Sequence, residues 1–284
     1  MRPTVVGRRR QRGGEAATIP ITIALSTSSP AICSFVLTQL LEHLAYDRGL
    51  CPVPVADGRE RVRVALEAVA ACTQGGRRRR QSPLLKRASR FLAAWETCSA
   101  LVTPPPLPAE KAASSSGGAG SPQSLSSTAT QWALVIGPSA ARPREVVTVA
   151  FVDAAHQPLS LAVIASTHAG SPGADSSASA SLQWRRVLLS LLVASDSVPT
   201  WGQSPLVGKG ILLMKAPSVP APDSGCVTKP ALELNAKHRA PQVDIKLVLQ
   251  SKRMGAAAGM ASLECTTTCW HQGGRPLKPI TKIA

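Results

Sequence analysis

Cys265, Cys269 and His271 are the residues whose types and spacing come nearest to a metal site. Zinc takes four thiolate or imidazole ligands, and Cys226 or His238 could supply the fourth. Against a metal, structural zinc ligands usually stand closer together along the chain, and the threonines around Cys269 are typical of a strand. We therefore expect no metal and no other cofactor.

Signatures of other chemistry are incomplete. Residues 202–210 (GQSPLVGKG) imitate a phosphate-binding loop, but they contain one extra residue, and Gly210 follows the lysine where Ser or Thr is needed. The chain has no Gly-x-Ser-x-Gly motif and no triad spacing. Glu264 and Asp244 have no evident carboxylate partner, and His43 lies in an apolar segment. We predict that the protein is not an enzyme, and an uncharacterised hydrolase remains the enzymatic alternative.

The strongest helix signal covers residues 30–48. Pro30 suits a first helical turn, and Gly49 is a natural C-terminal cap. Apolar side chains recur between them at helical spacing: Val36, Leu37, Leu40, Leu41 and Leu44. We expect an amphipathic helix that packs one face on a core.

Further elements follow from the same patterns. Residues 82–102 and 182–195 predict long helices, and residues 59–72 predict a shorter one. Strands are predicted at 132–136, 145–151, 159–166, 208–215, about 231–236, 243–250 and 262–270. Because helices and strands do not strictly alternate, the chain should be α+β, with three main helices on a mostly antiparallel sheet.

Three segments have the composition of flexible regions. Residues 1–18 are rich in Arg and Gly and predict a disordered basic tail. Insertions at about 104–130 and 168–180 are rich in Pro, Ser and Gly. The remaining chain, 19–284, should form a single domain.

The order of the predicted elements resembles the comet family of Mad-two-binding proteins, which silence the spindle checkpoint. Residues 40–48 carry its Leu-Leu-x-His-hydrophobic-x-Tyr-x-Arg helix, and residues 52–54 carry its Pro-x-Pro exit. Later segments fall in the same order, at 84–103, 131–152, 185–208, 229–234 and 243–249. The resemblance implies a HORMA-like domain with a C-terminal safety-belt region.

The resemblance also implies two binding sites. The client-binding residues would be Tyr46, Asp47, Arg48, Val187, Leu188 and Leu189, and the ATPase-contact residues would be Lys229 and Pro230. This chain departs from the animal pattern at Asp47, which replaces an uncharged polar residue, and at Leu189, which replaces an aromatic one. Ala231 stands where a further basic residue is usual.

The function implied is that of an adaptor. It would bind closed Mad-two, or a related HORMA protein, and deliver it to the hexameric AAA+ ATPase Pch-two for remodelling. That activity would silence the spindle assembly checkpoint, with a role in meiosis as an extension. The expected location is the nucleus and cytoplasm, on spindle or chromosomes.

The net charge of +16 leaves an alternative open. A basic nuclear scaffold would contact nucleic acid nonspecifically, since phosphate contacts need only Lys and Arg. The run Arg77, Arg78, Arg79 and Arg80, with Lys86 and Arg87, is either a nuclear import signal or a solvated loop. Seven scattered cysteines make no disulfide framework and favour a reducing compartment, and no apolar run reaches the roughly 18 residues of a membrane span.

Overall fold

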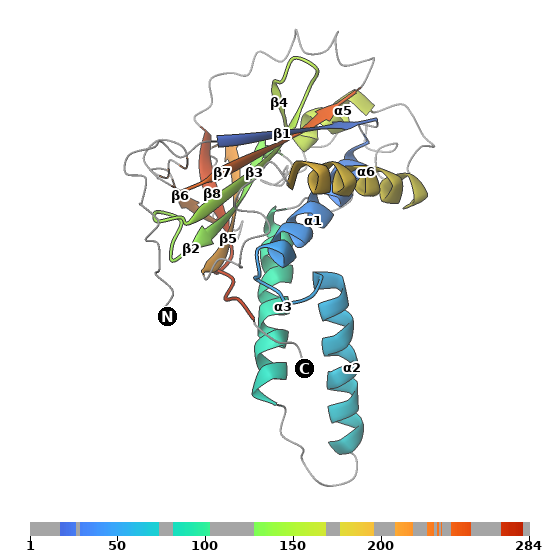
Figure 1. The fold of residues 1–284 in the computed structure, drawn as a ribbon, viewed down its shortest axis with the longest axis vertical. Coiled ribbons are helices and arrows are strands. Elements are labelled where there is room, and N and C mark those ends of the chain that lie inside the picture. Colours follow the sequence, from blue (N-terminus) through green and yellow to red (C-terminus); the bar gives the residue numbers. More distant parts are fainter. Residues whose placement is uncertain are drawn as a thin grey trace, which may run out of the picture.

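The computed structural model describes residues 18–26, 29–73, 82–102, 128–168, 177–195, 208–217, 226–229, 232, 234, 240–250 and 268–280. Its centre is an eight-stranded sheet in the order β1-β7-β3-β2-β5-β8-β6, with β4 beside β3 (Figure 1). The strands are β1 (Thr18–Leu25), β2 (Gln131–Gly137), β3 (Glu145–Val152), β4 (Pro158–Leu159), β5 (Lys209–Pro217), β6 (Cys226–Lys229), β7 (Gln242–Leu249) and β8 (Thr268–Gly273).

The sheet is mixed but mostly antiparallel, which confirms the predicted α+β class. Strand β7 pairs in parallel with both β1 and β3. The other pairs are antiparallel. The described helices number five rather than three: α1 (Pro30–Asp47), α2 (Val55–Thr73), α3 (Pro83–Val102), α5 (Leu161–His168) and α6 (Ser177–Ser195).

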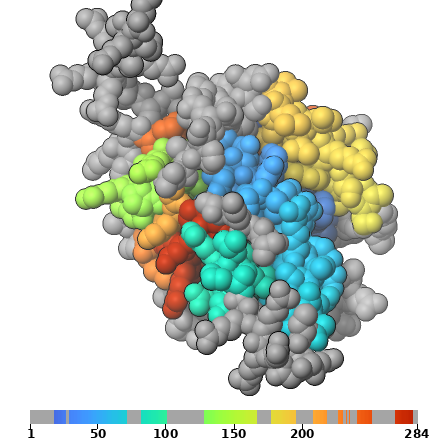
Figure 2. Space-filling view, turned by 60° about the horizontal axis from the view of Figure 1, so that its bottom comes forward, coloured from blue at the N-terminus to red at the C-terminus, as the bar shows by residue number. Residues whose placement is uncertain are grey.

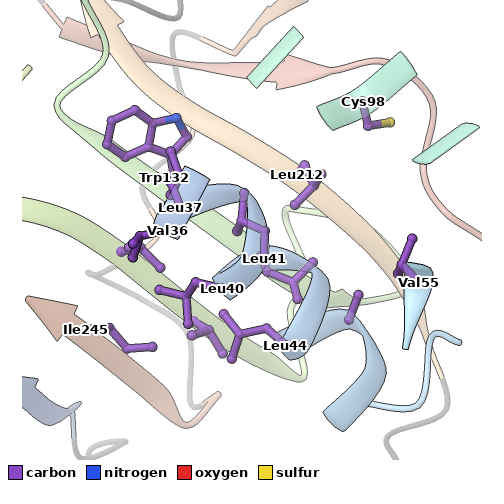
Figure 3. Packing of buried hydrophobic residues seen from close by; sticks show 14 of the residues in the cluster. Val36, Leu37, Leu40, Leu41, Leu44, Val55, Cys98, Trp132, Leu212 and Ile245 are labelled. Carbon is purple, nitrogen blue, oxygen red and sulfur yellow. The ribbon is translucent and has the colours of Figure 1, made fainter. Parts of the chain in front are cut away.

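Helix α1 forms the centre of the larger core, as its apolar spacing predicts. Pro30 is in its first turn, and Gly49, with φ of 70°, reverses the chain after Arg48. Its predicted apolar residues, Val36, Leu37, Leu40, Leu41 and Leu44, are all buried (Figure 3). Each such burial is worth about 1.5–3 kcal/mol, so this one helix face contributes a large share of the stability.

The two faces of the sheet are covered differently. The helix face includes Trp132, whose ring meets Phe151 edge-on at 5.8 Å between centroids. On the other face a smaller cluster joins strand side chains, among them Trp270, to Leu234, which lies outside the strands. Alternate residues of β2 face the two clusters, because successive side chains in a strand point to opposite sides.

Helices α2 and α3 form a two-helix arm that extends away from the sheet (Figure 1). Helix α2 confirms the helix predicted at 59–72 and extends beyond it at both ends. Phe91 and Trp95 stack within α3, with ring centroids 6.4 Å apart. In the view of Figure 2, α6, α1, α2 and α3 lie across one face of the molecule.

The strand predicted at 159–166 is wrong. Only Pro158 and Leu159 form β4, and Leu161–His168 is helix α5. The short apolar run suits either structure by periodicity alone. The Ser160 hydroxyl accepts a hydrogen bond from the Val163 amide at 3.3 Å, which caps a helix, and the helix then buries Ile164.

Both predicted insertions are shorter than expected. Ser177–Ser195 is one helix, so the residues from 177 to 180 are helical. Ala129 is buried, and the Thr130 amide donates to the Lys215 carbonyl at 2.9 Å, so both belong to the folded domain. Residues 104–127 and 169–176 of these insertions lie outside the described residues, as do residues 1–17 of the predicted tail.

The C-terminal strands also differ from the prediction. Leu232 and Leu234, predicted within a strand at about 231–236, belong to none, and the Leu232 amide closes a turn onto the Lys229 carbonyl at 3.1 Å. The strand in this region is β6, which ends at Lys229. The strand predicted at 262–270 is described from Thr268 on, as β8.

Gly210 on β5 should not tolerate a side chain. A Cβ there would overlap the Leu50 Cδ1 atom, and Leu50 is itself fully buried. We expect Gly210→Val to lower the free energy of unfolding by about 1–3 kcal/mol, because overpacked cores must shift. Urea unfolding measures this, with exposed Lys209→Ala as the control. Unchanged stability of Gly210→Val would show that Leu50 has room to move.

Candidate client-binding surface

Helix α6 has two apolar faces. Gln183, Val187 and Leu191 follow one another at four-residue spacing and are buried. On the other side, four large apolar side chains are 50–78% exposed: Leu182, Leu189, Leu192 and Val193. Leu182, Leu189 and Val193 fall at the spacing i, i+7, i+11, so they form one stripe. We call these four residues the outer α6 face.

The inner side of α6 is fastened to α1 and to the end of β1. Trp184 meets His43 of α1 edge-on, with ring centroids 6.0 Å apart. Burial lowers the pKa of His43, so the ring is neutral at physiological pH. The Gln183 amide nitrogen donates to the Ser26 hydroxyl at 2.6 Å. Side chains of α6 therefore contact both α1 and the residue that follows β1.

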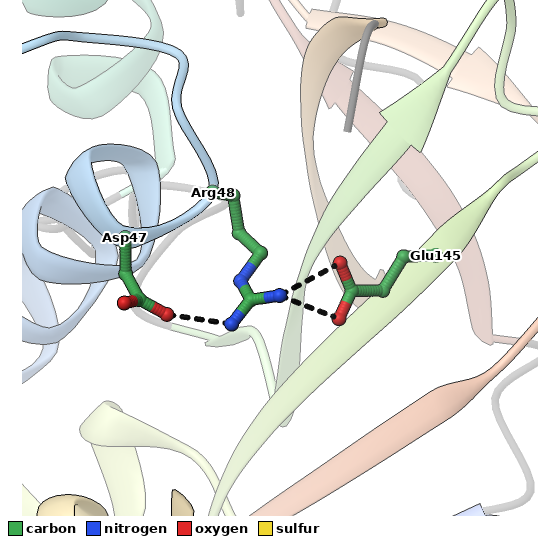
Figure 4. Close-up of polar contacts among 3 residues, drawn as sticks. All are labelled: Asp47, Arg48 and Glu145. Carbon is green, nitrogen blue, oxygen red and sulfur yellow. Dashed lines mark hydrogen bonds and ion pairs between the residues drawn. The ribbon is translucent and has the colours of Figure 1, made fainter. Parts of the chain in front are cut away.

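The end of α1 contains a buried ion pair. The Arg48 guanidinium is 4% exposed and lies between two carboxylates (Figure 4). Its Nη2 atom is 2.6 Å from Asp47 Oδ2, and its Nη1 atom is 3.4 Å from Glu145 Oε1. Glu145, the first residue of β3, is fully buried. Arg48 therefore ties the end of α1 to the sheet.

The predicted client-binding residues thus divide into two groups. Tyr46, Asp47 and Leu189 are exposed, and Leu188 is half-buried, so a partner can reach them. Arg48 and Val187 are buried, and their side chains support the surface from inside. Tyr46 and Asp47 lie one turn beyond His43, and α1 and α6 are neighbours (Figures 1 and 2).

Sequence reasoning missed Leu182, Leu192 and Val193. The sequence did contain a signal for these three residues, because residues 182–193 hold more apolar side chains than a helix with one buried face needs. A second apolar stripe opposite the first points to a partner, since isolated exposed leucines are ordinary but a contiguous row is not.

The proposed ATPase contact lies at an edge of the sheet. Lys229 ends β6, the outermost strand on that side, and is half-buried. It stands opposite Trp270, which in turn stands opposite Lys215. Pro230 lies outside the described residues.

Lys86 and Arg87 of the predicted import signal are exposed near the start of α3. The Arg87 guanidinium donates to the Pro279 carbonyl at 3.0 Å, so it also fastens the C-terminal segment. The four arginines at 77–80 lie outside the described residues.

The candidate metal ligands are only partly described. Cys269 Sγ and His271 Nε2 are 3.3 Å apart, and Thr228 Oγ1 lies 3.2 Å from His271 Nδ1. Burial lowers the pKa of His271. Cys265 and His238 lie outside the described residues, and in the part of the chain that is described no three His, Cys, Asp or Glu side chains gather as ligands.

Cys33 of α1 and Cys98 of α3 are free, buried cysteines. Burial raises the pKa of the Cys33 thiol to about 12 and that of Cys98 to about 11, so both stay protonated at neutral pH.

Within the described ranges, no helix is long and apolar enough to cross a membrane. A scan against protein-family models gives no match, and a search of curated proteins gives none either.

Proposed function

We propose that this protein is a non-enzymatic adaptor with a HORMA-like fold. It binds closed Mad-two, or a related HORMA protein, and delivers it to the AAA+ ATPase Pch-two, which remodels the client. The observation that carries the proposal is the outer α6 face, where four large apolar side chains are exposed on a helix already fastened by its other side.

Two further features support the proposal. The resemblance to the comet family places client contacts on the helices that are α1 and α6, and these helices are neighbours. The C-terminal segment follows the sheet and then α3: β8 pairs with β5 and β6, and Cys98 Sγ donates to the Arg275 carbonyl at 3.4 Å. A C-terminal segment that packs along the sheet in this way is compatible with the safety belt of a HORMA-like fold.

The direct test is binding of the purified chain to Mad-two held in its closed form, with the open form as the control. We expect saturable one-to-one binding of the closed form and at least tenfold weaker binding of the open form. Equal binding of both forms, or none, would remove Mad-two as the client.

The basic-scaffold alternative is favoured by a specific observation. Lys86, Arg87 and Arg90 are exposed together along one side of α3. If this surface binds nucleic acid, affinity should fall steeply with salt, because phosphate contacts release counterions. Duplex DNA binding measured from 50 to 200 mM salt, without protein partners, separates this role from the adaptor role.

Lys229 provides a prediction for the ATPase contact. An edge strand leaves its end accessible, and a lysine there is a point charge for an acidic motor surface. We expect Lys229→Glu with Pro230→Ala to bind the client normally but to lose most of the stimulation of its remodelling. Measurement with purified motor, ATP and closed client checks this, and Lys209→Glu on β5 is the matched charge control. Full stimulation by the double variant would exclude this site.

A further inference from the structure

Ser26, at the end of β1, is held by side chains from a distant helix. The Gln183 amide nitrogen and the Arg186 guanidinium of α6 both donate to its hydroxyl oxygen, at 2.6 and 2.9 Å. The Ser26 backbone amide lies 3.4 Å from Gln183 Oε1. Gln183 is 4% exposed, so one donor is fixed by packing, whereas Ser26 itself is exposed.

This arrangement of donors suits the binding of an anion. Two donors point at one oxygen, and one of them carries a positive charge. Neither Arg185 nor Arg186 forms a salt bridge within the described part of the chain. Helix α1 begins at Pro30, four residues further along the chain. A dianionic group on Ser26 would therefore meet a guanidinium that no carboxylate neutralises within the described residues.

We propose that Ser26 is a phosphorylation site whose phosphate is bound by Arg186. A protein kinase would supply the reaction with Mg·ATP. The serine oxygen attacks the γ-phosphorus and forms the new O–P bond, while the bond from that phosphorus to the β,γ-bridging oxygen breaks. ADP leaves with the electron pair, and the hydroxyl proton passes to the kinase's base. The exposed hydroxyl at the end of a strand can enter a kinase site.

The phosphate would fasten α6 more tightly to β1. A phosphoserine opposite an arginine forms one to three charge-assisted hydrogen bonds, which are stronger than the present bonds between the neutral hydroxyl and its donors. Helix α6 carries the outer α6 face, so the modification acts on the helix that presents it. The inference itself rests only on the Ser26 contacts and does not depend on the identity of the client.

The test installs phosphoserine at position 26 during synthesis of the full chain, and compares its melting midpoint with that of the unmodified protein. We expect a rise of about 2–4 °C. In an Arg186→Gln background the rise should vanish. In an Arg185→Gln background, the matched control, most of it should remain. Hydrogen exchange of the α6 backbone amides should slow in the phosphorylated protein and not in its Arg186→Gln variant.

An unchanged or lower melting midpoint on phosphorylation would overturn the proposal. So would an equal rise with and without Arg186, because the phosphate would then act through a group other than this guanidinium.

Discussion

Replacing Glu145 with Leu should lower the free energy of unfolding by about 3–5 kcal/mol. The change removes the buried carboxylate that pairs with Arg48, whose guanidinium is 4% exposed and keeps its positive charge. Breaking one side of a buried pair costs far more than the pair contributes, because the remaining charge stays out of water. Urea unfolding followed by circular dichroism measures the loss.

Two variants serve as controls for this prediction. Arg48→Met combined with Glu145→Leu should recover most of the loss, since apolar replacement of both partners leaves no buried charge. Arg63→Met removes an exposed arginine that pairs with Glu60 and Glu67, and should leave the free energy of unfolding almost unchanged, because water and salt screen exposed pairs. A single Glu145→Leu variant as stable as Arg63→Met would mean that the Arg48 pair does not hold the fold.

Charged residues on the outer α6 face should abolish client binding. Leu189 and Val193 are 63% and 78% exposed, so Leu189→Glu with Val193→Glu should fold normally. In a complex, both carboxylates would be buried without partners, and we expect affinity for closed Mad-two to fall about 100-fold or more. Titration calorimetry gives the affinity, and thermal melting confirms the fold.

The matched control for this variant is Val64→Glu with Leu84→Glu. These side chains are 51% and 43% exposed on the α2–α3 arm, away from α6. They add the same charge and should leave the affinity within about twofold. If both pairs weaken binding equally, the effect is one of net charge, and the outer α6 face has no special role.

A helix or strand could be predicted where the residues that determine it lie within the element itself. Helix α1 has apolar spacing, an initial Pro30 and a final Gly49, so periodicity and caps agree. Strand β1 was not predicted, because Pro20 and Thr22 interrupt its apolar run, and because it is formed by parallel pairing with β7, far along the chain.

The candidate client-binding surface could be predicted only in part, because it too depends on contacts between residues far apart in the sequence. Arg48 was expected to face a partner, because the resemblance to the comet family implies a client contact at that position. Its burial depends on Glu145, which is 97 residues away in sequence, and nothing near Arg48 signals that contact. The exposure of Leu189 does not depend on a distant residue. Once Val187 and Leu191 are placed on the buried face of α6, the helix period alone puts Leu189 on the other face.

The measurement that tests the adaptor role most directly is conversion of closed Mad-two to its open form by purified Pch-two and ATP. We predict that conversion is slow with the motor alone, and rises at least tenfold when this protein is added. The variant Leu189→Glu with Val193→Glu should give no stimulation, and Val64→Glu with Leu84→Glu should give full stimulation. Conversion at the same rate with and without the protein would contradict the proposed function.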